Sequence, residues 1–448
     1  LIALGGYGRC ELCFESDIDV MFLLEEQTDP VPARAAVHDI LHRLLDVGVT
    51  VGHSTRTVEE CAALADTDFE SWTSLLEGRR ICGNEMLASD LERMIRARSA
   101  KEQARALVRE ALARREQRHE KYGNSVKLLE PNVKQSAGAL RDLHLILWLA
   151  RGTGLWPWKE YSAERTSATD RLLRHPRLWS GLGRSMLRDG RNALSFLLRA
   201  RNELHLQSRR PLDTLEFSLQ KSVAETLGYR GTLRRSSTEC FMQDYYVAAR
   251  AAARLCNAVT GRFEHQFGVN GAHKRTTPID ERFVLSGGEL RLRQKASFLS
   301  APAILTALHH RIHRMCRLSP LLEETINRSV PRLRPLTGPD ETSRFRSLLN
   351  QSRGVTDALR LLNDLHVLER WVPEWKPMVA FFQHNVYHYY TADEHTLRVI
   401  ETAERLAGGT NDFAAVYRTL PRRDILFLAG LLHDIAKPRR IGDHEIIG

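Results

Sequence analysis

The chain has 448 residues, of which 43% are hydrophobic, so it can build roughly two to four domains with cores of their own. No apolar run approaches the roughly 18 residues that a membrane span needs, which argues against a membrane protein. The net charge of +10 suits nucleic acid, nucleotide phosphates or an acidic protein partner, but the basic stretches lack the interleaved aromatic residues of nucleic-acid binders.

The first 90 residues alternate between strand and helix patterns. Apolar runs with a period of two predict strands at 16–24, 49–57 and 71–83, and apolar spacing of three and four predicts helices at 32–48 and 58–66. This alternation predicts a small α/β domain over residues 1–90. A motif begins at once, and the first residue is Leu rather than Met, so we expect a fragment of a longer protein.

The remainder of the chain is mostly helical in pattern. We expect a helical substrate or linker domain at 91–265, a connecting region at 266–380 and a helical domain at 381–448. The run "RFVLSGGELRLR" in the connecting region predicts a hairpin that turns at Gly287 and Gly288. The fold class is therefore predicted as α+β and mostly helical.

The strand "SDIDVMFLL" carries the first candidate site. Its period of two places Asp17 and Asp19 on one face. Paired carboxylates favour Mg²⁺, which leaves coordination positions open for phosphate oxygens. The upstream glycines Gly5 and Gly6 would let backbone N–H groups approach a triphosphate. The alternative is a surface turn followed by an edge strand with solvated acids.

The run "GGYGR.EL...SDIDV" resembles the signature of the nucleotidyltransferase superfamily that includes DNA polymerase beta. More narrowly, "LLEPNVKQSAGALRDLH" and "RNELHLQSRRPLDTLEFSLQ" resemble segments of the bifunctional uridylyltransferase/uridylyl-removing enzymes of bacterial nitrogen control. The resemblance implies a polymerase-beta-like fold for the first domain. It also implies that UMP is transferred from UTP to a tyrosine of the PII signal protein and is removed again. Cys10 and Phe14 depart from the family pattern, which has Gly and Pro there.

The resemblance assigns further residues to the transferase site. Ser16 joins the glycines in binding the nucleotide, and a third acid is needed on a neighbouring strand, for which Glu77 is our candidate. The alternative for Glu77 is an ion pair with Arg79 or Arg80. The motif that contains Lys134, Arg141 and Asp142 would contact nucleotide phosphates or ribose; the alternative is a helix-entry loop whose Arg141 and Asp142 are solvated.

A second candidate site lies in the last 60 residues. A helix is predicted from Thr391, with Glu394 completing a capping box, and His395, Val399, Ala403 and Leu406 share one apolar face. The order of the residues His395, His433, Asp434 and His444 resembles that of the HD phosphohydrolase superfamily, so we expect them to bind Mn²⁺ or Mg²⁺. The family's distal Asp would lie beyond Gly448, so the HD domain is expected to be truncated. Lys437 would neutralise a phosphate or, alternatively, be a solvated helix-end residue.

Three classes of function compete. The first is a two-site enzyme that acts on PII and UTP, with glutamine as an effector only in the intact protein. The second is a tRNA CCA-adding enzyme with an HD domain, against which the long segment between Asp19 and His395 argues. The third is a non-catalytic scaffold, against which the intact acids and histidines argue. We expect a cytoplasmic enzyme with no membrane partner and no nucleic-acid substrate, and the scattered cysteines suit a reducing cytosol.

Overall fold

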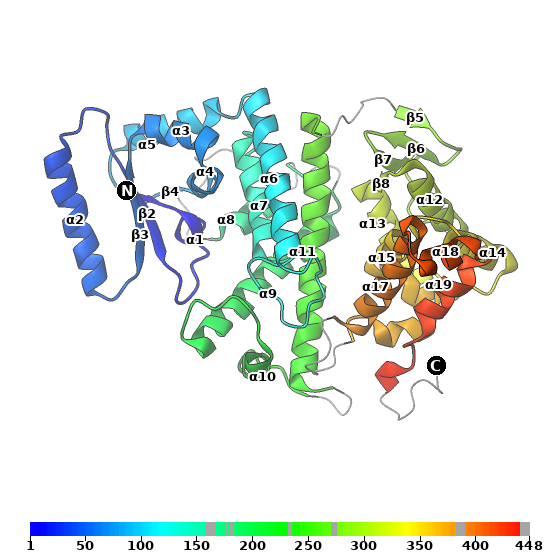
Figure 1. The fold of residues 1–448 in the computed structure, drawn as a ribbon. Helices are drawn as coiled ribbons and strands as arrows, with labels where there is room; N and C mark the ends of the chain where they lie inside the picture. The colour runs from blue at the N-terminus through cyan, green and yellow to red at the C-terminus, as the bar shows by residue number, and fades with distance from the viewer. Residues whose placement is uncertain are drawn as a thin grey trace.

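The computed structural model describes residues 1–156, 166–175, 178–179, 182–231, 235–269, 276–381 and 390–439. Three units follow one another in chain order, and Figure 1 shows them as a sheet unit in blue, a helical unit in cyan to green and a C-terminal unit in yellow to red. The predicted class, α+β and mostly helical, is confirmed. Among the described residues, no helix combines the length and apolar character that crossing a bilayer requires.

The N-terminal unit is built on a four-stranded mixed sheet in the order β3-β2-β1-β4. Strand β2 pairs in parallel with β3 and antiparallel with β1, so the sheet is mixed, in accord with the polymerase-beta-like fold that the resemblance implies. The elements of this unit are β1 (Ile2–Ala3), α1 (Gly5–Gly8), β2 (Ile18–Leu23), α2 (Pro30–Asp46), β3 (Val51–Arg56), α3 (Val58–Thr67), α4 (Phe69–Leu76), β4 (Arg79–Arg80) and α5 (Glu85–Ala97).

The strand predicted over 71–83 is wrong for most of its length. Residues 69–76 form helix α4, and only the two residues of β4 are extended. Trp72, Leu75 and Leu76 are buried at helical spacing, and the Asp68 carboxylate caps the helix by accepting from the backbone N–H groups of Glu70 and Ser71. Glu77 therefore lies at the C-terminal end of a helix.

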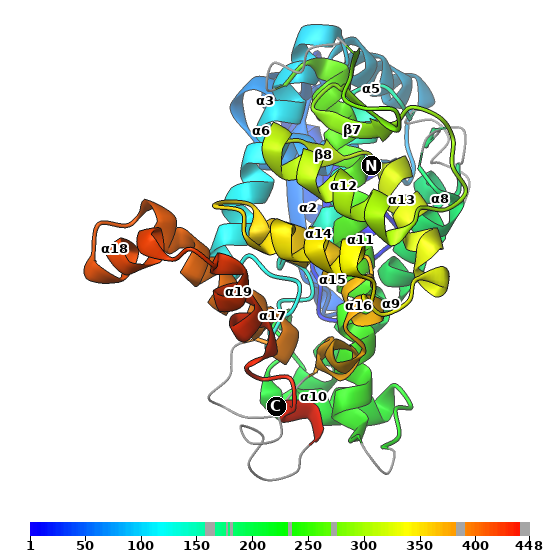
Figure 2. The ribbon, with the colours of Figure 1, turned by 90° about the vertical axis from the view of Figure 1, so that its right-hand side faces the viewer.

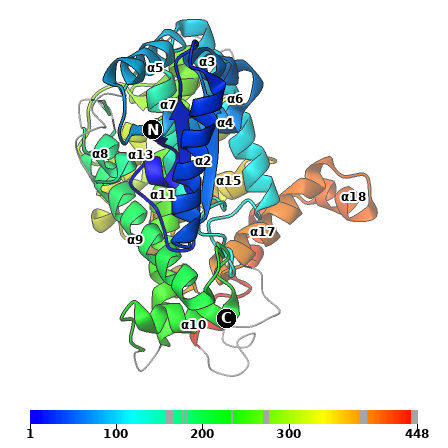
Figure 3. The ribbon, with the colours of Figure 1, turned by 90° about the vertical axis from the view of Figure 1, so that its left-hand side faces the viewer.

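Helix α2 joins β2 to β3 and has no buried residue. Figure 3 shows it standing in front of the sheet unit. Asp29 caps its first turn by accepting from the N–H of Val31. The helix contributes little to the core of the N-terminal unit.

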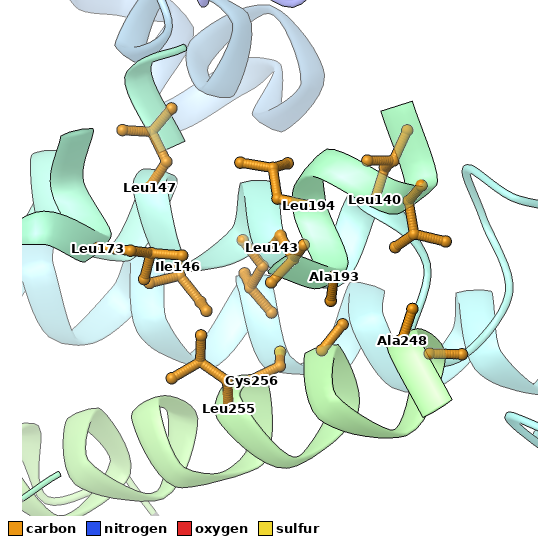
Figure 4. Close-up of a cluster of buried hydrophobic side chains, with 14 of the residues drawn as sticks. Leu140, Leu143, Ile146, Leu147, Leu173, Ala193, Leu194, Ala248, Leu255 and Cys256 are labelled. Atoms are coloured by element: carbon orange, nitrogen blue, oxygen red, sulfur yellow. The ribbon is translucent and has the colours of Figure 1, made fainter. Parts of the chain in front are cut away.

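The middle unit is helical, as predicted. It contains α6 (Lys101–Lys121), α7 (Leu140–Gly152), α8 (Ala168–Arg174), α9 (Arg184–Ser208), α10 (Phe217–Thr226) and α11 (Ser237–Phe267). Figure 4 shows Leu143 and Ile146 of α7 in contact with the side chains of α9 and α11, and all of these residues are buried. Gly138, with φ of +73°, lies so close to the carbonyl of Ala249 that a side chain would collide with it.

Asp142 ties α7 to α6. Its carboxylate is wholly buried and accepts from Arg118 at 2.6 Å, from His119 at 2.9 Å and from the N–H of Gly138 at 2.8 Å. Burial opposes ionisation, but the hydrogen bond with His119 and the charges of Arg115 and Arg118 hold the pKa of Asp142 well below its usual range. The alternative of a solvated Asp142 is therefore wrong.

The C-terminal unit contains a second sheet and a helical array. Its sheet has the order β5-β6-β7-β8, and the predicted hairpin over Gly287 and Gly288 is confirmed, with both glycines at positive φ. The elements are β5 (Thr276–Pro278), β6 (Phe283–Ser286), β7 (Glu289–Leu292), α12 (Ala301–Arg314), β8 (Arg317–Leu318), α13 (Pro320–Ser329), α14 (Pro339–Leu349), α15 (Val355–Asp364), α16 (Leu368–Trp371), α17 (Ala392–Arg405), α18 (Asp412–Thr419) and α19 (Arg423–Leu432).

One hydrophobic core runs through this unit from Phe283 to Leu431. It crosses the domain border that we predicted at 380, and that border stays a prediction. Figure 2 shows α17, α18 and α19 extending to one side of the molecule.

The start of α17 corrects two predictions. Thr391 is its N-cap, but the capping box does not form, because the Thr391 hydroxyl donates to Asp393 at 2.6 Å and the Glu394 carboxylate binds Arg360. The predicted apolar face is also wrong: the buried face carries Thr396, Leu397 and Ile400, whereas Val399 is exposed.

The C-terminal unit docks on the middle unit through the start of α17. Lys127 Nζ lies 2.5 Å from Asp393 Oδ2, and both side chains are buried, with 4% and 0% exposed. Leu128 and Tyr390 form an isolated β-bridge, and the N–H of Thr391 donates to the carbonyl of Lys127. We refer to residues 123–135 as the docking segment, because its first half contacts α17.

Candidate active sites

A pocket of about 710 Å³ lies between the N-terminal sheet unit and the helices of the middle unit. Its walls come from the α1–β2 segment, from α4, α6 and α7, and from the end of the docking segment. Asp142 does not line it, but the other residues that we predicted for the transferase site do: Gly5, Gly6, Ser16, Asp17, Asp19, Glu77, Lys134 and Arg141. The structure therefore brings together residues that lie more than 100 positions apart in the sequence.

The carboxylate of Asp19 lies between two glycines. A Cβ on Gly5, whose φ is +53°, would lie 2.7 Å from one carboxylate oxygen, and a Cβ on Gly52 would lie 2.5 Å from the other. Gly52 lies opposite Asp19 in the β2–β3 register. Sequence reasoning missed Gly52, and the available signal was a glycine within a predicted strand. Both glycines make room for the carboxylate.

The acids of the pocket influence one another. Burial first, and then the charges of Asp17 and Glu77, raise the pKa of Asp19 above its ordinary value. A cation in the pocket would oppose this shift. The hydroxyl of Ser16 is buried and has no hydrogen-bond partner among the residues that the structure describes. It lines the same pocket, so it can donate to a bound oxyanion.

Glu77 is held by two partners. Its Oε1 accepts from Trp148 Nε1 at 2.6 Å, and its Oε2 forms an ion pair with Arg9. The alternative pairing with Arg79 or Arg80 is wrong, because Arg79 donates to the carbonyl of Tyr7 and Arg80 pairs with Glu85. The catalytic role of Glu77 stays a prediction.

Buried polar contacts fix the loop between Gly8 and Asp17. Glu11 accepts from Arg9 at 2.8 Å and from Ser167 at 2.6 Å, and it contacts His144 on α7 at 2.9 Å. Burial and the nearby Arg9 lower the pKa of His144 to about 4. Cys10 has φ of +58°, which explains why a glycine would suit this position, but it does not line the pocket.

Cations gather at the opposite wall of the pocket. Burial and the neighbouring Arg201 lower the pKa of Lys134, whose Nζ lies 3.6 Å from Asp213. Asp213 also binds Arg201 at 2.7 Å, and sequence reasoning missed both of these residues. The guanidinium of Arg141 stacks over the ring of Trp148, 5.4 Å from its centre. This wall can bind phosphate oxygens.

The second site contains a compact group of ligand-type side chains. His395 of α17 and His433 and Asp434 at the end of α19 place one ligand atom each within 4.8 Å of one another. The Nε2 atoms of His433 and His395 lie 3.4 Å and 4.0 Å from Asp434 Oδ2. The Nδ1 of His433 contacts the carbonyl of Gly430 at 2.8 Å, which leaves its Nε2 available to a metal. Two imidazoles and a carboxylate fit a divalent cation.

Lys437 and His444 were also predicted for this site. Lys437 is neither solvated nor free, because its Nζ donates to Asp434 Oδ2 at 3.0 Å. Burial opposes ionisation of Asp434, but the hydrogen bond from Lys437 and the neighbouring histidines keep its pKa below the ordinary value. His444 lies outside the described residues.

Comparisons with known families match two segments of the chain. Residues 106–260 match the family described as GlnD PII-uridylyltransferase, and residues 392–448 match the HD domain family. The first segment contains Lys134, Arg141 and Arg201 of the pocket, and the second contains His395, His433 and Asp434.

Relatives align with the chain along nearly its whole length. A bifunctional uridylyltransferase/uridylyl-removing enzyme of Caulobacter vibrioides is 33% identical over 98% of this chain and 47% of its own length. Proteins with the same name from Bordetella avium and Thiobacillus denitrificans are 34% and 35% identical over 100% of this chain and 51% of theirs. The chain spans about half the length of these curated relatives. No solved structure matches the chain.

Proposed function

Because this chain belongs to the family of bifunctional uridylyltransferase/uridylyl-removing enzymes, we propose that it transfers UMP from UTP to a tyrosine of the PII signal protein and also hydrolyses that bond. The observation that carries the transferase part is the common pocket. It combines Asp17 and Asp19 with Lys134 and Arg141, which are the charges that a metal–triphosphate complex requires. Neither the matched families nor the relatives favour the tRNA CCA-adding alternative.

In the transferase site, Asp17 and Asp19 would hold Mg²⁺, which supplies charge stabilisation at the reacting phosphate. Lys134 and Arg141 would bind the triphosphate oxygens, and the Ser16 hydroxyl would donate to one of them. The N–H groups at Gly5 and Gly6 would contact the same phosphates, since no side chain separates them from the ligand. Glu77 would be the third acid, for which Arg9 has to withdraw from its Oε2 atom.

In the second site, His395, His433 and Asp434 would hold Mn²⁺ or Mg²⁺, which supplies an activated water at neutral pH. Lys437 already contacts Asp434 and would orient that carboxylate. His444 would be a further ligand, as the resemblance implies, and the family's distal Asp would complete the set. Separate residues thus serve transfer and removal.

The test incubates the intact enzyme that contains this chain with labelled UTP, Mg²⁺ and a purified PII protein, and then with uridylylated PII and Mn²⁺. Label on a PII tyrosine supports the transferase, and release of UMP supports the hydrolase. Label that appears in tRNA instead, with binding that falls steeply as salt rises, would contradict the proposal.

The proposed function also implies an effector and a cellular compartment. Glutamine would act as an effector in the intact protein. The enzyme would work in the cytoplasm, where nucleoside triphosphates are available.

A further inference from the structure

A second cavity of about 690 Å³ lies between the middle and C-terminal units and has Arg115 in common with the transferase pocket. Helices α6 and α11 form one side, and α15 and the start of α17 form the other, next to the docking segment. Its volume is within the range of small-molecule sites, which is about 300–1,000 Å³. Lysine and arginine side chains outnumber the acidic ones in the lining: Arg109, Arg115, Lys127, Arg250, Arg254, Arg317 and Arg360.

Most of these cations have a carboxylate within ion-pair distance. Lys127 pairs with Asp393, Arg317 with Glu264 at 2.8 Å, and Arg360 with Glu394 at 2.8 Å, while Arg115 lies 3.5 Å from Asp142. The cations that lack such a partner therefore determine whether the cavity can bind an anion.

Among the other cations that the structure describes, Arg109 is exposed to solvent, which leaves Arg250 and Arg254. They lie one turn apart on α11, and within the described part of the chain neither has a carboxylate within 4.0 Å. Arg250 is only 9% exposed and donates to His366 Nε2 at 2.7 Å. The Nε of Arg254 is buried and has no hydrogen-bond partner among the described residues. Buried cationic donors without an acceptor are costly.

Nearby acids do not remove this imbalance. Asp364 lines the cavity and attracts Arg250, but it is beyond ion-pair distance. Glu323 lies in the adjoining cavity with Arg254, and burial raises its pKa to about 7, so it is partly neutral near neutral pH. Two guanidinium groups one turn apart can bind a planar or tetrahedral oxyanion through paired N–H groups.

We propose that this cavity binds a small oxyanion that carries at least two negative charges, a phosphate or a dicarboxylate, between Arg250 and Arg254. The bound anion contacts α11 directly and neutralises the charge that faces α15. Because the walls come from two units, binding also stabilises the docking of the C-terminal unit on the helical unit.

The test uses isothermal titration of the whole chain with inorganic pyrophosphate and, in a separate arm, with glutarate, both in EDTA. Arg254→Gln is expected to weaken binding of the preferred anion about tenfold or more, and Arg254→Lys to restore part of it. Arg314→Gln removes an exposed charge that does not line the cavity, and is expected to leave binding unchanged. Lys134→Ala, in the transferase pocket, is expected to leave the Arg254-dependent binding intact.

If Arg254 only stabilised the fold, its variants would change the melting temperature and not the anion affinity. Since Arg254 has no ion-pair partner to lose among the described residues, Arg254→Gln without anion is expected to melt at or above the temperature of the parent chain. A lower melting temperature with unchanged anion binding would overturn the proposal. So would binding that Lys134→Ala abolishes, or the failure of both anions to bind.

Discussion

Lys127→Met would leave the buried carboxylate of Asp393 without its cation. Both side chains are almost fully buried, and removing one partner of such a pair costs about 3–5 kcal/mol. Thr391 and Asn363 still donate to Asp393, which places the expected cost near the lower end of that range. Hydrogen–deuterium exchange of residues 391–405 measures it, because local opening of α17 governs their protection. Amide exchange in α17 is expected to accelerate by roughly two to three and a half powers of ten.

The control is Arg43→Met on α2, which breaks an ion pair with Asp39 whose side chains are 76% and 64% exposed. Exposed pairs of this kind contribute about 0.3–0.5 kcal/mol, so little change is expected. Adding Asp393→Asn to Lys127→Met should recover much of the protection, since no buried charge remains. Exchange in Lys127→Met within threefold of the parent chain would refute the reasoning.

The acidity of Asp393 adds a pH test. Burial opposes its ionisation, but Lys127, Thr391 and Asn363 hold its pKa below the ordinary value. The stabilisation from this group is therefore present above the unfolded pKa and is lost as the pH falls through the folded pKa. In Lys127→Met the effect of burial prevails and raises the pKa of Asp393. Protonation of Asp393 then removes the cost of burying an unpaired charge. The difference in exchange protection of α17 between the parent chain and Lys127→Met should narrow from pH 7 to pH 5. A difference that stays constant over this range would contradict this account.

Three further predictions concern single positions, and the first two are made in the intact enzyme. Asp19→Asn should lower UMP transfer by orders of magnitude and leave removal intact, as measured with labelled UTP and PII, and near-normal transfer would disprove the metal role. His433→Ala should abolish UMP release and keep transfer, and release at the parent rate would show that the hydrolytic site lies elsewhere. Gly138→Ala should destabilise the middle unit by more than about 2 kcal/mol, because the added methyl group collides with Ala249. Gly48→Ala, also at positive φ but facing open space, should cost only about 1 kcal/mol. Equal melting temperatures of the two variants would argue against the collision.

Local patterns predicted the elements that depend on local physics. The strand that follows Asp17 and the glycine hairpin were found because alternation and turn chemistry act over a few residues. Residues 71–83 were misread because Trp72, Leu75 and Leu76 form an apolar run that fits a strand or a helix, and only their packing decides between the two.

The arrangement of the sites was less accessible to sequence reasoning. Strand spacing and the glycine run predicted Asp17, Asp19, Gly5 and Gly6, whereas the other transferase residues came from the family resemblance. No spacing rule places Lys134 in the same pocket as Asp17. Asp213 and Arg201 were missed because their partners lie on other elements. The partner of Glu77 was wrong for the same reason, since neighbours in sequence were considered and Arg9 was not.

The docking segment limits the modularity of the protein. Lys127 holds α17, which carries His395, and only seven positions later Lys134 lines the transferase pocket. A C-terminal unit produced alone would contain Asp393 without its cation, and a graft from another protein would need an acid at the same place. Recombination between relatives is therefore expected to conserve the 127–393 pairing, or to replace both residues together.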